Sequence, residues 1–482
     1  MPPLQSKVED VRAEAVPIFL GLLALTATGA VVLGTRYGTI GFAAVFLAVA
    51  FGLFLLWRVE TLPAITILYM SLLPLESKAD VFSLPYFYYT PLSPVLMMAM
   101  LAVLFLERNA ALPRTHPEAP RKDLLGTWIL LLIAWLTFET LRGFALHHQM
   151  RFIRSELFNL AFLLAYYFWR TLFRWRGQFE GWMKYIAVVS GLVAIIYMYF
   201  VSITFTNVLD FIFFRIITRQ TNLLIIAVPV VGALYYSSPH RASRWGWGLL
   251  ALLLLVETFI SQQRGLWLVV AGELFLLVSL YSFRDGWNRV GLRRWAIWVL
   301  IPIVLIVVIL LGALTLLHID FPTLFSRWKN IGTKLDASAM MRYFDIRDGL
   351  WYFKQSPLIG AGVGATMFIS FNHAHFYFFD NSYIMMLFKG GLPMLLLYLV
   401  IYGIGLYRAH YVFRYGGTFR LRMFGLAALV AITGILVLST MYTAILYYRF
   451  NFIYMMMFAL VTVLKESHCE LPGKQPHEPQ YA

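Results

Sequence analysis

Long apolar stretches recur along the whole chain, and they constrain the fold more than any other feature. A helix that crosses the hydrocarbon of a bilayer needs roughly 20 apolar residues, and about fourteen such stretches are present. They begin near Val16, Ile40, Thr61, Pro91, Leu124, Glu156, Met183, Thr221, Trp245, Arg264, Trp295, Ser382, Met423 and Asn451. Of the 482 residues, 60% are hydrophobic and 13% are charged, which lies outside the range of soluble domains. We therefore expect an all-α, polytopic membrane protein with about 12–14 transmembrane helices.

The basic residues indicate how the chain is oriented in the membrane. The net charge of +15 is spread over short clusters between apolar stretches, which is typical of membrane loops and argues against nucleic-acid binding. These clusters occupy alternate connections, at residues 108–122, 174–176, 241–244, 284–294 and 408–422. The positive-inside rule makes those connections cytoplasmic. The long hydrophilic segment 318–381 then lies outside the cytoplasm, where a loop of this length is often functional.

Four segments are expected from this topology. Residues 1–14 are polar and mixed in charge, so we expect a cytoplasmic tail without a cleavable signal peptide. Residues 15–204 form the N-terminal transmembrane helices, and residues 205–464 form a second membrane domain that includes the loop 318–381. Residues 465–482 are expected to be a disordered cytoplasmic tail. The single cysteine, Cys469, excludes an internal disulfide framework and a thiolate metal cluster.

Several arginines fall on the extracytoplasmic side, where short loops are normally poor in them. They are Arg215, Arg219, Arg264, Arg342 and Arg347. A guanidinium binds phosphate oxygens through two parallel hydrogen bonds, so several converging arginines would suit a diphosphate. The alternative is that they extend toward the membrane interface or pair with neighbouring aspartates.

The large loop contains a predicted helix followed by a glycine-rich turn. Residues 337–355 form an amphipathic pattern that Pro357 ends, and Gly360, Gly362 and Gly364 follow. Because no Lys-Ser or Lys-Thr pair comes after them, these glycines predict close backbone packing rather than a nucleotide-binding loop. The next apolar helix is interrupted at residues 389–393, where the freed backbone groups need partners within the protein or in a watery cavity. Such a break predicts a neighbouring site.

Candidates for proton transfer are His373, His375 and Asp380, in the second half of the loop. Two histidines and a later carboxylate are a weak metal-binding pattern, so no metal site is predicted, and ordinary loop histidines are the alternative. Glu257 and Glu273 fall within predicted spans, where a carboxylate favours a function such as coupled transport. Against transport, the charged residues gather on one side, and the two halves show no inverted symmetry.

Three motifs carry a resemblance to a known family. They are Arg219-Gln-Thr-Asn222, Ser261-Gln-Gln-Arg264-Gly265, and Arg342 followed by Pro357-Leu-Ile-Gly360-Ala-Gly362-Val-Gly364. The last is similar to the Arg, then Pro-Leu-x-Gly-x-Gly-x-Gly signature of the bacterial O-antigen ligase and O-antigen polymerase superfamily. From about Arg215 to Leu406, the chain resembles this superfamily. Ligases typically carry His-Asn after the signature, and Asp380-Asn381 stands there in this chain.

The resemblance implies a membrane glycosyltransferase of the GT-C type. It would take a glycan from undecaprenyl diphosphate at the periplasmic face of the bacterial inner membrane, without a cofactor or an essential metal, and pass it to an acceptor sugar. Arg219 and Arg342 would bind the diphosphate, and Asp380 or a nearby histidine would activate the acceptor hydroxyl. Asp380 favours a polymerase of O-antigen or exopolysaccharide repeat units over a ligase that uses lipid A core. A lipid-linked glycan flippase is the further alternative. Expected partners are membrane lipids and a chain-length regulator or other assembly proteins.

Overall fold

The structure, a computed structural model, describes the C-terminal three quarters of the chain with gaps. Described are residues 67, 123–150, 152–153, 156, 162–176, 179–204, 223–261, 263–283, 290–293, 297, 337–370, 373–376, 381–441 and 448–469. The chain forms two compact units, 1–70 with 83–119 and 71–82 with 120–482, and the described residues other than Ile67 belong to the second. The first four predicted spans and the span near Trp295 lie largely outside the described residues.

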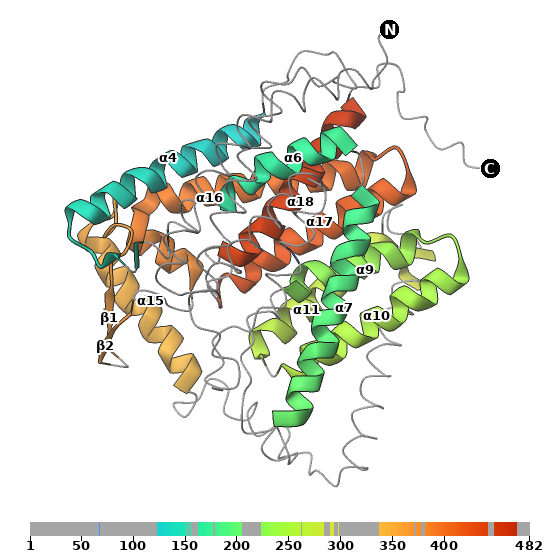
Figure 1. Cartoon of the computed structure of the whole chain (residues 1–482), viewed down its shortest axis with the longest axis horizontal. Helices are drawn as coiled ribbons and strands as arrows, with labels where there is room; N and C mark the ends of the chain where they lie inside the picture. Colours follow the sequence, from blue (N-terminus) through green and yellow to red (C-terminus); the bar gives the residue numbers. More distant parts are fainter. Residues whose placement is uncertain are drawn as a thin grey trace, which may run out of the picture. The chain divides into compact units, whose positions relative to one another are not determined.

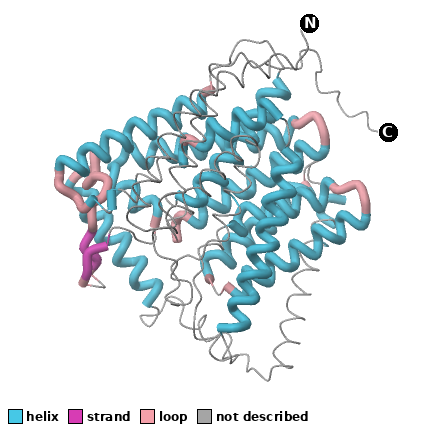
Figure 2. The backbone as a smooth tube through the Cα atoms, in the orientation of Figure 1, coloured by secondary structure: helices cyan, strands magenta, loops and turns pink. Residues whose placement is uncertain are grey.

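The described part of the chain is helical apart from one short hairpin (Figures 1 and 2). Its helices are α4 (Leu124–Ala145), α6 (Ala165–Arg176), α7 (Phe179–Thr204), α9 (Leu224–Ser237), α10 (Arg241–Ile260), α11 (Arg264–Ser282), α15 (Ala337–Gln355), α16 (Ser382–Tyr415), α17 (Phe419–Leu438) and α18 (Tyr448–Cys469). Its strands are β1 (Met367–Ile369) and β2 (Ala374–Phe376). Five of these helices are long and apolar enough to cross a membrane: α4, the first part of α7, α11, α16 and α17. The predicted all-α, polytopic membrane fold is confirmed.

The predicted spans agree with the helices to within a few residues at most starts. α4, α11 and α16 begin at the predicted residues, and α15 has the predicted bounds. The stretch that begins near Glu156 is different, because a turn at Leu164 precedes α6. α18 continues to Cys469, five residues into the predicted tail. The hairpin was not predicted, since each strand has only three residues.

The core of the unit is built around α16, α17 and α18. α17 packs against α16, α9 and α11, and α18 packs against α6 and α16. Residues 451–464 of α18 are buried on every side, as expected for a helix that is apolar all round and enclosed by others. The indole of Trp169 in α6 donates a hydrogen bond of 3.0 Å to the carbonyl of Phe452.

Capping residues fix where α16 begins, and they tie that point to the end of α17. The Asn381 side chain accepts a hydrogen bond from the Ile384 N–H at 3.0 Å, the usual role of an N-cap asparagine. The same side chain donates to the carbonyl of Thr440 at 2.9 Å, and the Ser382 N–H donates to the carbonyl of Ser439 at 3.0 Å. The start of α16 therefore lies beside the end of α17, and the two helices run antiparallel.

At the other end of α16, an ion-pair network joins four helices. Arg170 of α6 pairs with Asp123, which precedes α4, at 2.8 Å and with Glu466 of α18 at 2.9 Å. Arg408 of α16 approaches Asp123 at 3.5 Å and donates to the hydroxyl of Thr462 at 2.5 Å. These residues lie on the side that the basic clusters predict to be cytoplasmic, and they fix the register of the helices there.

Candidate functional site

The break in α16 is the centre of the candidate site. Gly391 has φ 67° and ψ −168°, a conformation that only glycine adopts without strain. Pro393, two residues later, has no N–H to donate to the carbonyl of Lys389. The carbonyls just before the break therefore need hydrogen-bond donors from elsewhere in the protein, as the sequence predicts.

The glycine-rich turn supplies those partners. The N–H groups of Ala361 and Gly362 donate to the carbonyls of Phe388 and Lys389 at 2.6 and 2.9 Å. A Cβ on Gly360 would lie 2.7 Å from the Lys389 carbonyl oxygen, so the turn approaches α16 as closely as backbone allows. The prediction that these glycines serve close backbone packing is confirmed.

Two further hydrogen bonds complete the contact. The Leu392 N–H donates to the carbonyl of Pro357 at 2.9 Å, and the Trp135 indole of α4 donates to the carbonyl of Gly390 at 3.0 Å. Groups from the loop and from α4 thus satisfy the backbone at the predicted break. These hydrogen bonds hold the segment after α15 in one position.

The end of α4 and the residues after it hold the turn from the other side. Arg142 pairs with buried Glu139 at 2.7 Å and donates to the carbonyls of Ile359 and Gly360. The imidazole of His148 lies 3.0 Å from the carbonyl oxygen of Ala361. These contacts place the end of α4 and the residues after it against the large loop. Because its guanidinium is engaged by these protein oxygens, Arg142 supports the turn rather than binding an anion.

A buried ion pair lies directly under the turn. Lys389 of α16 pairs with Glu156, and the second oxygen of that carboxylate accepts the Gly364 N–H at 3.0 Å. Their side chains are 3% and 8% exposed, so the pair is fully enclosed. It links α16, the turn and the segment before α6 through one carboxylate. The pair could not be predicted from the sequence, because partners 233 residues apart leave no local pattern.

The helix of the large loop, α15, packs on the first half of α16. Gly349 allows this approach, since a Cβ there would lie 2.2 Å from the Cγ2 of Ile384. The rings of Tyr352 and Phe388 meet edge to face at 5.6 Å between centroids. α15 also contacts β1, so the helix and the hairpin form one assembly beside the start of α16.

Two of the predicted anion-binding arginines lie on α15. Arg342 is half-buried, and Arg347 is 47% exposed, with its guanidinium 4.3 Å from the Phe344 ring centroid. Arg347 pairs with Asp348 at 2.7 Å, which is one of the pairings that the sequence left open. Asp348 also accepts the Ser370 N–H at 2.7 Å and so ties α15 to the end of β1. Desolvation raises the pKa of Asp348, but the hydrogen bonds from Ser370 and Arg347 outweigh it and hold that pKa below its usual value.

The hairpin carries the two predicted histidines. β1 and β2 are antiparallel, and Phe368 is paired with His375, whose ring lies 5.4 Å from the phenyl centroid. His373 stands at the turn with φ 49°, and both histidines are exposed. They lie on the surface of the loop beside α15 rather than in its packed interior.

The remaining predicted site residues are placed in part or not at all. Arg264 is the first residue of α11, and its side chain lies outside the described part of the structure. Arg215, Arg219 and Asp380 also lie outside it. Within the described ranges, no three histidine, cysteine, aspartate or glutamate side chains are grouped as metal ligands.

The two intramembrane carboxyls lie away from this site. Glu257 of α10 and Glu273 of α11 are buried. Glu273 faces Gly434 of α17, where an added Cβ would lie 1.9 Å from the carboxyl oxygen, so the glycine makes room for the acid. Neither residue contributes to the packing of the glycine-rich turn.

Comparison with known proteins identifies part of this region. Residues 249–399 match the family model described as O-antigen ligase. The matched segment contains the second half of α10, α11, α15, the glycine-rich turn, the hairpin and α16 as far as Leu399. Among curated proteins, none matches the chain. The match confirms that residues 249–399 resemble the O-antigen ligase and polymerase superfamily.

Proposed function

We propose that the protein is a glycosyltransferase of bacterial surface polysaccharide assembly, which transfers a glycan from a polyprenyl diphosphate to an acceptor sugar. The observation that carries this proposal is the docking of the matched glycine-rich segment onto the break in α16. That contact fixes α15, with Arg342 and Arg347, beside the N-terminus of α16. Cationic groups are thereby held at one end of the membrane-spanning helices, where a lipid-linked diphosphate would present its charge.

The chemistry assigned to the site is a displacement at the anomeric carbon of the donor sugar. The acceptor hydroxyl oxygen forms the new glycosidic bond while the bond from that carbon to the diphosphate oxygen breaks. The leaving diphosphate keeps the electron pair, and arginines such as Arg219 and Arg342 stabilise its charge. The proton of the hydroxyl passes to a base, for which Asp380, His375 and His373 are the candidates. Arg215, Arg264 and Arg347 would complete the diphosphate site.

The acceptor distinguishes a polymerase from a ligase. We favour a polymerase of O-antigen or exopolysaccharide repeat units because Asp380 precedes Asn381, where the resemblance to ligases would require histidine. Asn381 caps α16, and Asp380 directly precedes it in the sequence. A ligase that uses lipid A core is the alternative, and both reactions would occur at the periplasmic face of the inner membrane.

The test is transfer from undecaprenyl diphosphate-linked glycan by the purified chain in liposomes. Wild type is compared with Arg342→Ala, Asp380→Ala and the control Lys354→Ala, an exposed residue in the last turn of α15. We expect Arg342→Ala to reduce the rate about 100-fold, the usual effect of removing one donor to a developing charge, and Lys354→Ala to leave it unchanged. A ladder of products indicates a polymerase, and a single product on lipid A core indicates a ligase.

Two results would contradict the proposal. The first is a wild-type chain that transfers no glycan but moves the lipid-linked donor across the bilayer, in which case Glu257 and Glu273 become the residues to test. The second is equal loss of activity in Arg342→Ala and Lys354→Ala, which would show that the arginine has no particular role.

A further inference from the structure

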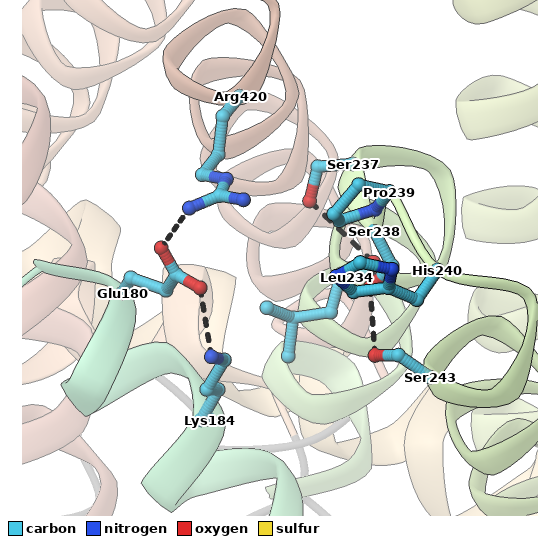
Figure 3. A pocket seen from close by; sticks show the side chains of 9 residues that line it. All are labelled: Glu180, Lys184, Leu234, Ser237, Ser238, Pro239, His240, Ser243 and Arg420. Carbon is cyan, nitrogen blue, oxygen red and sulfur yellow. Dashed lines mark hydrogen bonds and ion pairs between the residues drawn. The ribbon is translucent and has the colours of Figure 1, made fainter.

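A polar hollow of about 230 Å³ lies among α7, α17 and the connection between α9 and α10 (Figure 3). The groups that matter for its chemistry are Glu180, Lys184, Ser237, His240, Ser243 and Arg420. They come from four helices or their immediate ends. None of them is part of the glycine-rich turn, α15 or the hairpin, so the hollow is separate from the candidate transferase site.

Helix geometry places the hollow at the opposite side of the membrane. Arg420 is the second residue of α17, and the last residue, Leu438, leads directly to the contact with the start of α16. Eighteen residues at 1.5 Å each separate these two ends by about 27 Å, close to the thickness of the hydrocarbon layer. The connections at the hollow's end carry the basic clusters, which indicates the cytoplasmic side.

The two cationic side chains of the hollow pair with the same carboxylate. Glu180 pairs with Lys184 at 2.8 Å through one oxygen and with Arg420 through the other. Two cations and one anion leave a net positive charge on these three side chains. Lys184 and Arg420 are 49% and 44% exposed, so a solute or a lipid headgroup can reach them. Figure 3 shows one guanidinium nitrogen of Arg420 on Glu180 and another turned toward Ser237.

The opposite wall adds further polar groups. Arg244 donates to the carbonyl of Ser238 at 2.7 Å and so holds the connection, and the hydroxyls of Ser238 and Ser243 lie 3.2 Å apart. His240 directly precedes α10, whose first N–H groups have no acceptor within the helix and carry partial positive charge. Both walls of the hollow therefore favour negative charge between them.

We propose that this hollow binds a phosphate group at the cytoplasmic face of the membrane, with Arg420 and Lys184 as its principal ligands. Guanidinium and ammonium groups are the usual partners of phosphate oxygens, and Arg420 can offer a second N–H beside the one that Glu180 accepts. One water occupies about 30 Å³ in the liquid, so the hollow has room for a phosphate and several waters. The phosphate is carried either by an anionic lipid headgroup or by a soluble molecule.

Glu180 has a defined part in this site. Its carboxylate neutralises one of the two cations and would compete with an incoming phosphate. Replacing it with glutamine removes the competitor and keeps the size of the side chain. The proposal therefore predicts opposite effects at neighbouring residues: weaker phosphate binding for Arg420→Gln and Lys184→Gln, and tighter binding for Glu180→Gln.

The test measures the melting temperature of the purified full chain in a zwitterionic detergent as probes are added. The probes are inorganic phosphate and dihexanoyl phosphatidylglycerol. Their controls are sodium chloride at equal ionic strength and dihexanoylglycerol, which has the same chains without phosphate. Arg414→Gln, an exposed arginine at the end of α16, is the matched control variant.

We expect a saturable rise in the melting temperature of wild type and of Arg414→Gln. The apparent Kd should increase about tenfold or more in Arg420→Gln and Lys184→Gln and decrease about tenfold in Glu180→Gln, as expected for one charge-assisted contact. A response to phosphatidylglycerol but not to free phosphate identifies a lipid headgroup, and the reverse identifies a soluble phosphate. No response to either probe, or equal responses of Arg420→Gln and Arg414→Gln, would overturn the proposal. If Arg420→Gln does not fold, the gain of affinity in Glu180→Gln still decides the question.

Discussion

The ion pair between Lys389 and Glu156 shows how one residue can hold several elements. The Lys389 side chain is only 3% exposed, and it pairs with Glu156, which also accepts the Gly364 N–H. Burying two charges is costly, and the pair contributes mainly by fixing which groups meet. Its position under the glycine-rich turn makes it a support for the candidate site rather than a part of the reaction.

Replacing Lys389 with methionine should destabilise the protein strongly. The change leaves the Glu156 carboxylate buried beside an apolar chain, which costs about 3–5 kcal/mol when one partner of a buried pair is removed. The double variant Lys389→Met/Glu156→Gln should recover most of this loss, because glutamine still accepts the Gly364 N–H. Unfolding of the purified variants in a denaturing detergent measures both effects. Strictly additive losses in the double variant would show that the two residues are not coupled.

Asp348 should make the contact between α15 and the hairpin sensitive to acid. Its folded-state pKa is below the ordinary value, so its stabilising effect is present at neutral pH and is lost as the pH falls through that lower pKa. Asp348→Asn should therefore be less stable than wild type at pH 7, and the difference should shrink below about pH 4, the ordinary range of aspartate. Amide hydrogen exchange at Ser370, followed against pH, gives the measurement. A difference that stays constant down to acid pH would refute the assignment.

Among the elements, α16 depends on glycine at one position and not at another. A Cβ on Gly391 would lie 2.4 Å from the Leu358 carbonyl oxygen at a positive φ, whereas a Cβ on Gly403 meets nothing within 4 Å. Gly391→Ala should thus destabilise the protein by more than about 1–3 kcal/mol, the cost of a strained backbone. Gly403→Ala should be neutral or stabilise by about 0.5–1 kcal/mol. Thermal unfolding of the two variants compares them directly, and similar melting temperatures would contradict this account of the break.

The sequence predicted these elements better than it predicted their contacts. α15 was predicted with its observed bounds, because an amphipathic pattern that ends before Pro357 is a local signal. The break at residues 389–393 and the close packing of the glycines were also predicted, since proline and glycine act on the backbone wherever they stand. The distant partners of the break and of the glycine-rich turn could not be predicted, because Trp135, Arg142 and Glu156 are more than 200 residues away in the chain. The hairpin with His375 was missed because strands of three residues have no measurable periodicity.

The larger unit, in the part that the structure describes, has two chemically different ends. The antiparallel pair α16 and α17 joins them: Asn381 and Thr440 meet at the end with the glycine-rich turn, and residues 416–418 connect the helices at the other. The first end presents Arg342, Arg347 and two exposed histidines. The second holds the ion-pair network of Arg170 and the hollow that contains Arg420. The proposed transfer reaction and the proposed phosphate site would thus lie at opposite ends of these two helices.

This arrangement predicts that Lys354 and Gly417 lie on opposite faces of the membrane. Lys354 is exposed in the last turn of α15, and Gly417 is exposed in the connection between α16 and α17. Each is replaced by cysteine in a chain whose single native cysteine, Cys469, is changed to serine. A membrane-impermeant maleimide should label Lys354→Cys in intact spheroplasts and Gly417→Cys only after lysis. Because a helix of the length of α17 can cross the bilayer once, labelling of both positions from the outside would contradict the topology from which both proposed sites are argued.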